Sequence, residues 1–205
     1  MTASGPAADA PRALADPAEA ARRRAMLGAP HFAPLAAYAA ALRDRAPGAE
    51  VPDVDPLDGG TGARVLFLLE KPGPKTSPAR GGTGFVSRDN PDPTATASWH
   101  FLRAAGLART DCVIWNACPW WNGTIRFTTA ERRDGLAALP AFLDLLPALR
   151  VAVCVGRQAG RARGALEGRG LAVLESAHPS PQVRAANRAA WDAIPEVWAR
   201  AAAAL

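Results

Sequence analysis

The chain has 205 residues, of which 49% are hydrophobic, and its mean hydropathy is -0.05. These values are typical of a soluble globular protein that has room for one domain with a full core. The net charge is +5, and the basic excess lies after residue 63, where 18 basic and 11 acidic side chains occur. A basic folded region suggests a polyanionic partner, although a solvated surface gives the same count.

The three cysteines, Cys112, Cys118 and Cys154, are an odd number without C-x-x-C spacing. Cys112 and Cys154 also lie in apolar, strand-like runs, so we expect reduced, buried thiols and neither a disulfide framework nor a zinc site. The N-terminus lacks a basic segment followed by an apolar one, and no apolar run is long enough to span a bilayer. We therefore expect a cytoplasmic protein with no bound metal and no membrane contact.

The first third of the chain is predicted to be a tail followed by helices. Residues 1–17 are rich in Ala, Pro, Asp and Gly without periodicity, and we expect a disordered tail there. Residues 18–63 are predicted to form an N-terminal helical extension and loop. The expected helices are Pro17–Leu27 and Pro34–Arg45, and the loop is Pro47–Gly62.

From Arg64 onward, segments typical of strands and helices alternate. This alternation predicts a parallel sheet that is covered on both faces. We therefore expect an α/β domain over residues 64–205, a three-layer sandwich with a central four-stranded parallel sheet flanked by helices. The predicted strands are Val65–Glu70, Cys112–Asn116, Arg150–Val155 and Leu171–Glu175, and the main helices are Thr94–Ala105, Thr129–Leu146 and Arg188–Leu205.

The first of these strands ends in two charges that a buried strand would not carry, Glu70 and Lys71. They precede Pro72-Gly73-Pro74, in which the prolines stiffen the loop and remove two N–H donors. Ligands bind beyond the carboxyl ends of the strands in an open parallel sheet, so this loop is a candidate site. A surface turn with a solvated ion pair is the alternative. Later strands would bring Asn116 and His178 to the same edge.

Four motifs, in their order and spacing, resemble the uracil-DNA glycosylase superfamily. They are Pro72-Gly73 at a strand end, Gly82–Phe85 as G-x-G-F, Asn116 at a strand end, and His178–Pro181 as H-P-S-P. The resemblance implies a four-stranded parallel sheet between helices. It also implies a DNA repair enzyme that flips a damaged base out of DNA and hydrolyses the bond between base and sugar.

The resemblance further implies roles for individual residues. Phe85 would stack on the flipped base, Asn116 would read its amide edge, and His178 would stabilise negative charge that grows on the base O2. Each has a plainer alternative, because Phe85 could anchor the core, Asn116 could begin a turn, and His178 could be an ordinary loop residue. The loop with Ser180, Gln182 and Arg184 would grip phosphate and push into the duplex, and Pro72, Gly73, Lys75 and Arg88 would also contact DNA.

The first motif departs from the family pattern. Leu69 replaces the usual Gly, and Lys71 occupies the place of the Asp or Asn that activates or holds the water. Glu70 stands where an iron–sulfur branch of the family has its glutamate, but three scattered cysteines cannot supply four cluster ligands, so no cofactor is expected. Glu70 is then the nearest carboxylate that could orient water, and Asp89 is the fallback.

We therefore expect a monomeric DNA glycosylase that acts on uracil, or another deaminated base, in single- or double-stranded DNA. The alternative is a catalytically silent DNA-binding member of the same fold, which the presence of Lys71 in place of Asp or Asn favours. A nucleotide enzyme is disfavoured, because the first loop has no G-x-G-x-x-G or Walker pattern.

Lys71 and Lys75 are the only lysines among 24 basic residues. Lysine differs from arginine in that a desolvated lysine can lose its proton and act as a nucleophile. Two roles for Lys71 follow from this difference. It could attack the sugar or the abasic aldehyde and form a Schiff base, which would make the enzyme a lyase as well. Alternatively, it could stay charged, hold Glu70 in place and bind a phosphate or the abasic product.

Overall fold

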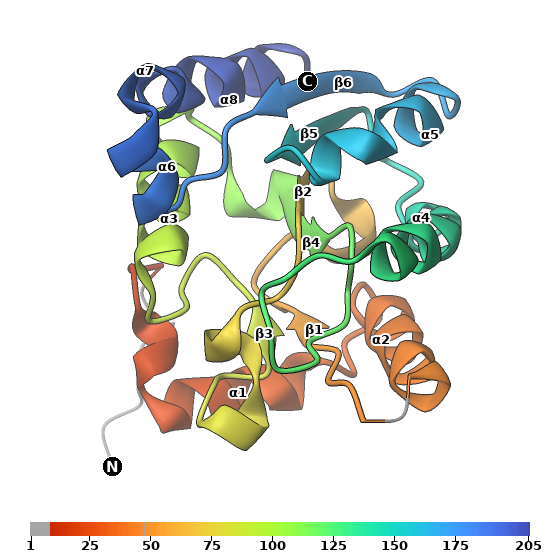
Figure 1. Ribbon diagram of the computed structural model, residues 1–205. Coiled ribbons are helices and arrows are strands. Elements are labelled where there is room, and N and C mark those ends of the chain that lie inside the picture. Colours follow the sequence, from red (N-terminus) through yellow and green to blue (C-terminus); the bar gives the residue numbers. More distant parts are fainter. Residues whose placement is uncertain (1–8, 47) are drawn as a thin grey trace.

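The central sheet of the computed structural model, which describes residues 9–46 and 48–205, has four parallel strands in the order β4-β2-β5-β6 (Figure 1). Helices cover both faces of this sheet, so the predicted three-layer α/β fold is confirmed. The observed strands fall within one residue of the predicted ones. They are β2 (Val65–Leu69), β4 (Cys112–Asn116), β5 (Val151–Val155) and β6 (Ala172–Ser176).

Strands β2, β4 and β5 are buried along nearly their whole length, which explains their continuous apolar sequences. Their carboxyl ends are in register, with Leu69 opposite Asn116. Beyond the strands, the Ala117 N–H donates to the Leu69 carbonyl at 2.7 Å and the Cys118 N–H donates to the Glu70 carbonyl at 2.9 Å. The loops that follow β2 and β4 therefore leave the sheet side by side.

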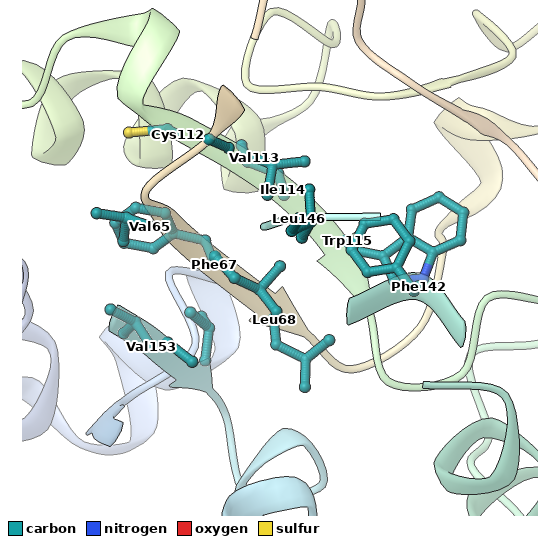
Figure 2. Close-up of a cluster of buried hydrophobic side chains, with 14 of the residues drawn as sticks. Val65, Phe67, Leu68, Cys112, Val113, Ile114, Trp115, Phe142, Leu146 and Val153 are labelled. Atoms are coloured by element: carbon teal, nitrogen blue, oxygen red, sulfur yellow. The ribbon is translucent and has the colours of Figure 1, made fainter. Parts of the chain in front are cut away.

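Aromatic side chains attach the helical layers to the two faces of the sheet. On one face, the Trp115 ring stacks on Phe142 of α4 with 4.9 Å between ring centroids (Figure 2). Tyr38 of α2 packs against both rings. On the other face, the Phe67 ring lies 4.7 Å from the ring of Trp198 in α8. The helices are α1 (Pro17–Met26), α2 (Ala33–Arg45), α3 (Pro93–Ala104), α4 (Thr129–Leu143), α5 (Arg163–Glu167), α6 (Pro181–Ala186), α7 (Arg188–Asp192) and α8 (Ile194–Ala203).

Three features differ from the sequence-based expectation for the folded region, and one of them is the short helix α6, which was not predicted. The closing helix is divided into α7 and α8, because Pro195 has no N–H to donate to the Trp191 carbonyl. A two-stranded parallel sheet, β1 (Asp53–Val54) with β3 (Phe85–Val86), was not predicted. Within the described part of the chain, no helix is long and apolar enough to cross a membrane.

The prediction of a disordered tail is wrong for residues 9–17, while residues 1–8 lie outside the described residues. Leu14 is buried with Ala20 and Phe85, and a 3₁₀ turn forms over Ala13–Ala15. The Asp9 carboxylate accepts hydrogen bonds from the Trp99 indole N–H at 3.0 Å and from the Arg88 guanidinium at 2.8 Å. These contacts hold the segment against α3 and the loop before it. The expected division of the chain at residue 64 stays a prediction.

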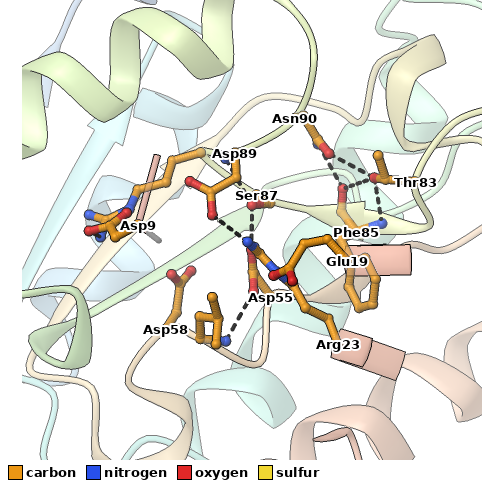
Figure 3. A network of polar contacts seen from close by, with 12 residues as sticks. Asp9, Glu19, Arg23, Asp55, Asp58, Thr83, Phe85, Ser87, Asp89 and Asn90 are labelled. Carbon is orange, nitrogen blue, oxygen red and sulfur yellow. Dashed lines mark hydrogen bonds and ion pairs between the residues drawn. The ribbon is translucent and has the colours of Figure 1, made fainter. Parts of the chain in front are cut away.

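A buried cluster of charges joins this N-terminal region to the rest of the fold (Figure 3). Arg23 of α1 has no solvent exposure and pairs with Asp55 and with Asp89, the latter at 2.8 Å. The Asp55 carboxylate also accepts a hydrogen bond from the Ser87 hydroxyl. The cluster therefore fixes residues 87–89, which begin the loop that leads to α3. Its charged members are Asp9, Glu19, Asp55, Asp58, Asp89, Arg23, Arg88 and Arg109.

The cluster contains more carboxylates than guanidinium groups, and Asp58 is the carboxylate with the fewest partners. One oxygen of Asp58 accepts from Arg109 Nε at 3.0 Å, while its Oδ2 is buried without a hydrogen-bond partner among the described residues. Burial, together with the neighbouring charges of Asp55 and Asp89, raises the pKa of Asp58 to about 7. The folded protein therefore keeps a proton on Asp58 in a pH range in which the unfolded chain has lost it.

This proton makes the stability of the fold sensitive to pH. Because the pKa of Asp58 is raised on folding, we expect the free energy of unfolding to fall as pH rises from about 4 to about 7. Asp58→Asn, which imitates the protonated carboxyl, should flatten this part of the profile in urea unfolding measured between pH 4 and pH 9. Asp44→Asn, at an exposed position, is the control and should leave the profile as in the wild type. An unchanged profile in Asp58→Asn would contradict the assignment.

Candidate active site

A cavity of about 1000 Å³ opens beyond the carboxyl ends of the four parallel strands. Its walls come from the loops after β2, β4, β5 and β6 and from the first turns of α3, which is the edge that the sequence predicts as the site. It brings together ten of the twelve predicted site residues and leaves out Phe85 and Arg184. The ten are Glu70, Lys71, Pro72, Gly73, Lys75, Arg88, Asn116, His178, Ser180 and Gln182.

Asn116 lies at the floor of the cavity, as the last residue of β4. The residue is 3% exposed, and its amide nitrogen Nδ2 is buried without a hydrogen-bond partner among the described residues. An unpaired buried amide costs free energy unless a ligand supplies the missing acceptor. The arrangement therefore suits a ligand that offers a hydrogen-bond acceptor at the base of the cavity.

Glu70 is held by the loop that follows β5. Its Oε1 accepts a hydrogen bond from the Gln158 backbone N–H at 2.8 Å. Gly156 makes this approach possible, because its φ is +96° and an added Cβ would lie 2.7 Å from Glu70 Oε1. The carboxylate is thus oriented at the wall of the cavity by backbone geometry.

His178 lies across the cavity, in the loop after β6. Burial lowers the pKa of His178, although the negative charges of Glu70 and Asp92 act in the opposite direction. The imidazole is therefore neutral at neutral pH and can donate one N–H without carrying a charge. Its own carbonyl accepts from the Ser180 N–H at 2.8 Å, which closes the turn at the H-P-S-P motif.

Asp92 is a second carboxylate of the cavity that the sequence analysis missed. It is the N-cap of α3 and accepts a hydrogen bond from the Ala95 N–H at 2.9 Å. Burial raises the pKa of Asp92, while these backbone hydrogen bonds and the nearby His178 lower it. An Asp-Pro pair before a helical segment is a recognisable N-cap signal, but it does not indicate that the capping carboxylate faces a site.

Lys71 does not pair with Glu70, which corrects the expected clamp. Its side chain is 3% exposed and its ammonium forms an ion pair with Glu131 of α4. The same ammonium donates to Asn122 Oδ1 at 2.8 Å and to the Arg126 carbonyl at 3.1 Å. Three acceptors match the three N–H groups of an ammonium, so Lys71 ties the loop of residues 119–128 to β2.

Phe85 is not at the cavity, which contradicts its expected role as the stacking ring. It is 1% exposed and packs in a separate cluster with Leu14 and Ala20, under the guanidinium of Arg24. Successive residues of a strand point to opposite sides, and it is Val86 that faces the cavity. The plainer alternative, a core anchor, therefore holds for Phe85.

Phe127, in the loop of residues 119–128, is the only phenylalanine, tyrosine or tryptophan among the described cavity residues. The sequence offered no periodic signal for it, because the loop between Pro119 and Thr128 has no regular structure from which a side-chain direction could be inferred.

Two further expectations are corrected by the charge cluster. Arg88 lines the cavity, but its side chain is 2% exposed and pairs with Asp9, so it is no surface contact for DNA. Asp89, the fallback carboxylate, is fully buried in ion pairs with Arg23 and Arg109 and does not reach the cavity. Asp92, three residues later, occupies the cavity instead.

The rim of the cavity is basic. Lys75 and Arg157 line it and are exposed, and Arg126 is exposed in the loop of residues 119–128. Arg184 lies on α6, just outside the cavity, with its guanidinium 5.7 Å from the centre of the Trp191 ring. Ser180 begins α6, and its hydroxyl accepts from the Val183 N–H at 3.4 Å.

Helix α4 packs directly against the backbone that follows Asn116. An added Cβ on Gly135 would lie 2.0 Å from the Ala117 carbonyl oxygen and 3.1 Å from its carbonyl carbon. Only glycine permits this contact between the helix and the turn that carries Asn116.

We expect Lys71→Met to lower the free energy of unfolding by on the order of 2 kcal/mol, because Glu131 would lose its buried counter-charge. Lys75→Met, at the exposed lysine, is the matched control and should change it by less than about 0.5 kcal/mol. Urea unfolding of the three proteins measures the difference.

Since the ammonium of Lys71 is already paired, borohydride should trap no adduct between Lys71 and abasic DNA. Equal stabilities of the two variants, or a trapped adduct, would contradict this role.

Comparison with known proteins identifies a family for the chain and a similar solved structure. Residues 57–202 match the sequence profile of the Uracil DNA glycosylase superfamily. A similar solved structure is the solution NMR structure of a protein from Methanosarcina acetivorans, provisionally described as a uracil DNA glycosylase. It is 16% identical with a TM-score of 0.44, and the match covers 68% of this chain and 91% of that chain. No curated protein matches. Because the profile match extends over more than half of the chain, the protein belongs to the uracil DNA glycosylase superfamily.

Proposed function

We propose that the protein removes uracil, or a related deaminated base, from DNA by hydrolysis of the N-glycosidic bond. The observation that carries the proposal is the buried, unpaired amide of Asn116 at the floor of the cavity. Its Nδ2 can donate to the uracil O4, and its Oδ1 can accept from the uracil N3–H. Cytosine presents the reverse pattern at these two positions and would leave the amide poorly paired.

His178 and the two carboxylates would stabilise the charges of the transition state. As the bond breaks, negative charge grows on the base and positive charge on the sugar, so preorganised groups of both signs lower the barrier. The neutral imidazole of His178 would donate to the base O2. Glu70, oriented by the Gln158 N–H, would face the sugar and its attacking water, with Asp92 as a second carboxylate nearby.

Phe127 takes the place that the sequence analysis gave to Phe85. A base that leaves the duplex loses its stacking partners, and an aromatic ring in the cavity replaces part of that interaction. Phe127 is half-buried in the cavity wall, whereas Phe85 is only 1% exposed and does not line the cavity.

The basic rim would hold the DNA backbone. Lys75, Arg157 and Arg184 are exposed around the cavity, and cations at such positions bind phosphates in a salt-dependent manner. The Gly73 loop and the turn at Ser180 would approach the phosphates on either side of the flipped nucleotide.

The alternative of a catalytically silent DNA-binding protein was favoured by Lys71 in the place of Asp or Asn. Because Lys71 supports the loop of residues 119–128, its presence is no argument against catalysis by Glu70 and His178.

The proposal is tested by incubating the protein with single- and double-stranded oligonucleotides that contain one uracil, then cleaving abasic sites with alkali. We expect strand cleavage with the wild type. His178→Ala should slow base release by roughly a hundredfold or more and Asn116→Ala somewhat less, because each removes a hydrogen bond to the base. Cleavage no greater than with heat-inactivated protein, on uracil and on the other deaminated bases, would refute the proposed activity and favour the silent binder.

The exchange of aromatic residues is tested separately. Phe127→Ala should lower kcat/KM for uracil release by roughly tenfold, since stacking on a base contributes about 1–3 kcal/mol. Phe85→Leu, a conservative change outside the cavity, should leave kcat/KM within about twofold of the wild type. If the two variants behave in the opposite way, Phe85 is the stacking residue after all.

A further inference from the structure

Ile125 is exposed in a way that distinguishes it from the other large hydrophobic side chains. Among the residues that the structure describes, it alone of these side chains is exposed, with 76% of its surface accessible. It lies in the loop of residues 119–128 and lines the cavity together with Phe127. A single exposed apolar residue is common on protein surfaces, but its location at the mouth of a site for a macromolecular ligand is informative.

The loop that presents Ile125 is held at both ends. On its N-terminal side, Asn122 accepts from Lys71, and on its C-terminal side Thr128 and Glu131 form a capping box at the start of α4. Between them, the Arg126 N–H donates to the Thr124 hydroxyl at 3.1 Å. These contacts fix the backbone on both sides of Ile125, so the side chain is presented without first being ordered by a ligand.

The position that the resemblance assigned to the duplex-entering loop carries a polar residue. Gln182 follows Pro181 in the H-P-S-P loop and is exposed at the same cavity. An amide that enters a base stack must give up hydrogen bonds to water, whereas an isoleucine side chain gains from leaving water. Of these two exposed cavity residues, Ile125 is the better suited to fill an apolar gap.

Resting on the proposed function, we propose that Ile125 is the residue that enters the base stack of duplex DNA and fills the space left by the flipped nucleotide. Apolar side chains that insert between base steps unstack them and offset part of the cost of distortion. The neighbouring Arg126 is exposed and can contact a phosphate beside the insertion point. Lys71 acts indirectly, by holding the loop in position.

The experiment compares duplex and single-stranded substrates, because a single strand has no partner stack to enter. We expect Ile125→Ala to lower the ratio of duplex to single-strand uracil release about tenfold. In Ile125→Leu, this ratio should be at least half of the wild-type ratio. Gln182→Ala should lower the ratio by less than threefold. A larger loss in Gln182→Ala than in Ile125→Ala would overturn the proposal and assign the insertion to the H-P-S-P loop.

A second measurement does not depend on base release. A duplex with 2-aminopurine next to the target uracil should gain fluorescence when the wild type binds, because insertion unstacks the probe. At saturating protein, Ile125→Ala should still bind the duplex, but its fluorescence gain should be at most half of the wild-type gain. An equal gain in both proteins would overturn the insertion by Ile125, whatever the release rates. An absence of release from both duplex and single strands by the wild type would instead count against the proposed function.

Discussion

The construction of the site depends on one buried charge, the guanidinium of Arg23. A side chain without solvent exposure must find its counter-charges inside the protein, because an unpaired buried ion costs several kcal/mol. Asp55 and Asp89 provide them, and they lie in the segment before β2 and in the loop before α3 (Figure 3). The wall of the cavity formed by residues 87–95 therefore depends on helix α1, which precedes all four strands of the central sheet in the chain.

The opposite wall depends on a second ion pair of a different kind. Lys71 and Glu131 join β2 to α4 across the loop of residues 119–128, and the compact ammonium satisfies three acceptors at once. A planar guanidinium has a different spacing of donors and would not match the same acceptors. This explains why one of the two lysines of an arginine-rich chain stands at this position. Lys71, the residue by which the first motif departs from the family pattern, thus holds the loop of residues 119–128 in position.

The sequence was sufficient to predict the sheet and most of the cavity, because buried parallel strands are continuous apolar runs whose ends define one edge. It was insufficient where a result depends on partners distant in the chain or on the direction of one side chain. Glu131, the partner of Lys71, is 60 positions away in the sequence. The sequence around Glu131 indicates only a capping box with Thr128 at the start of α4. Phe85 and Val86 form a two-residue strand, and so short a strand gives no alternation from which to decide which side chain faces the cavity. Helix α6 was missed although Ser180-Pro181 is a recognisable helix start.

The contact between Gly135 and Ala117 has a consequence for how this protein can change over evolutionary time. Gly135 has no side chain and does not line the cavity, yet any larger residue there would push α4 away from the Ala117 carbonyl, directly after Asn116. The Asn116 amide would then shift by up to about an ångström, with the helix and the strand both intact. Selection on the geometry of the cavity would therefore act on a glycine in the middle of a helix, at a position that does not itself line the cavity.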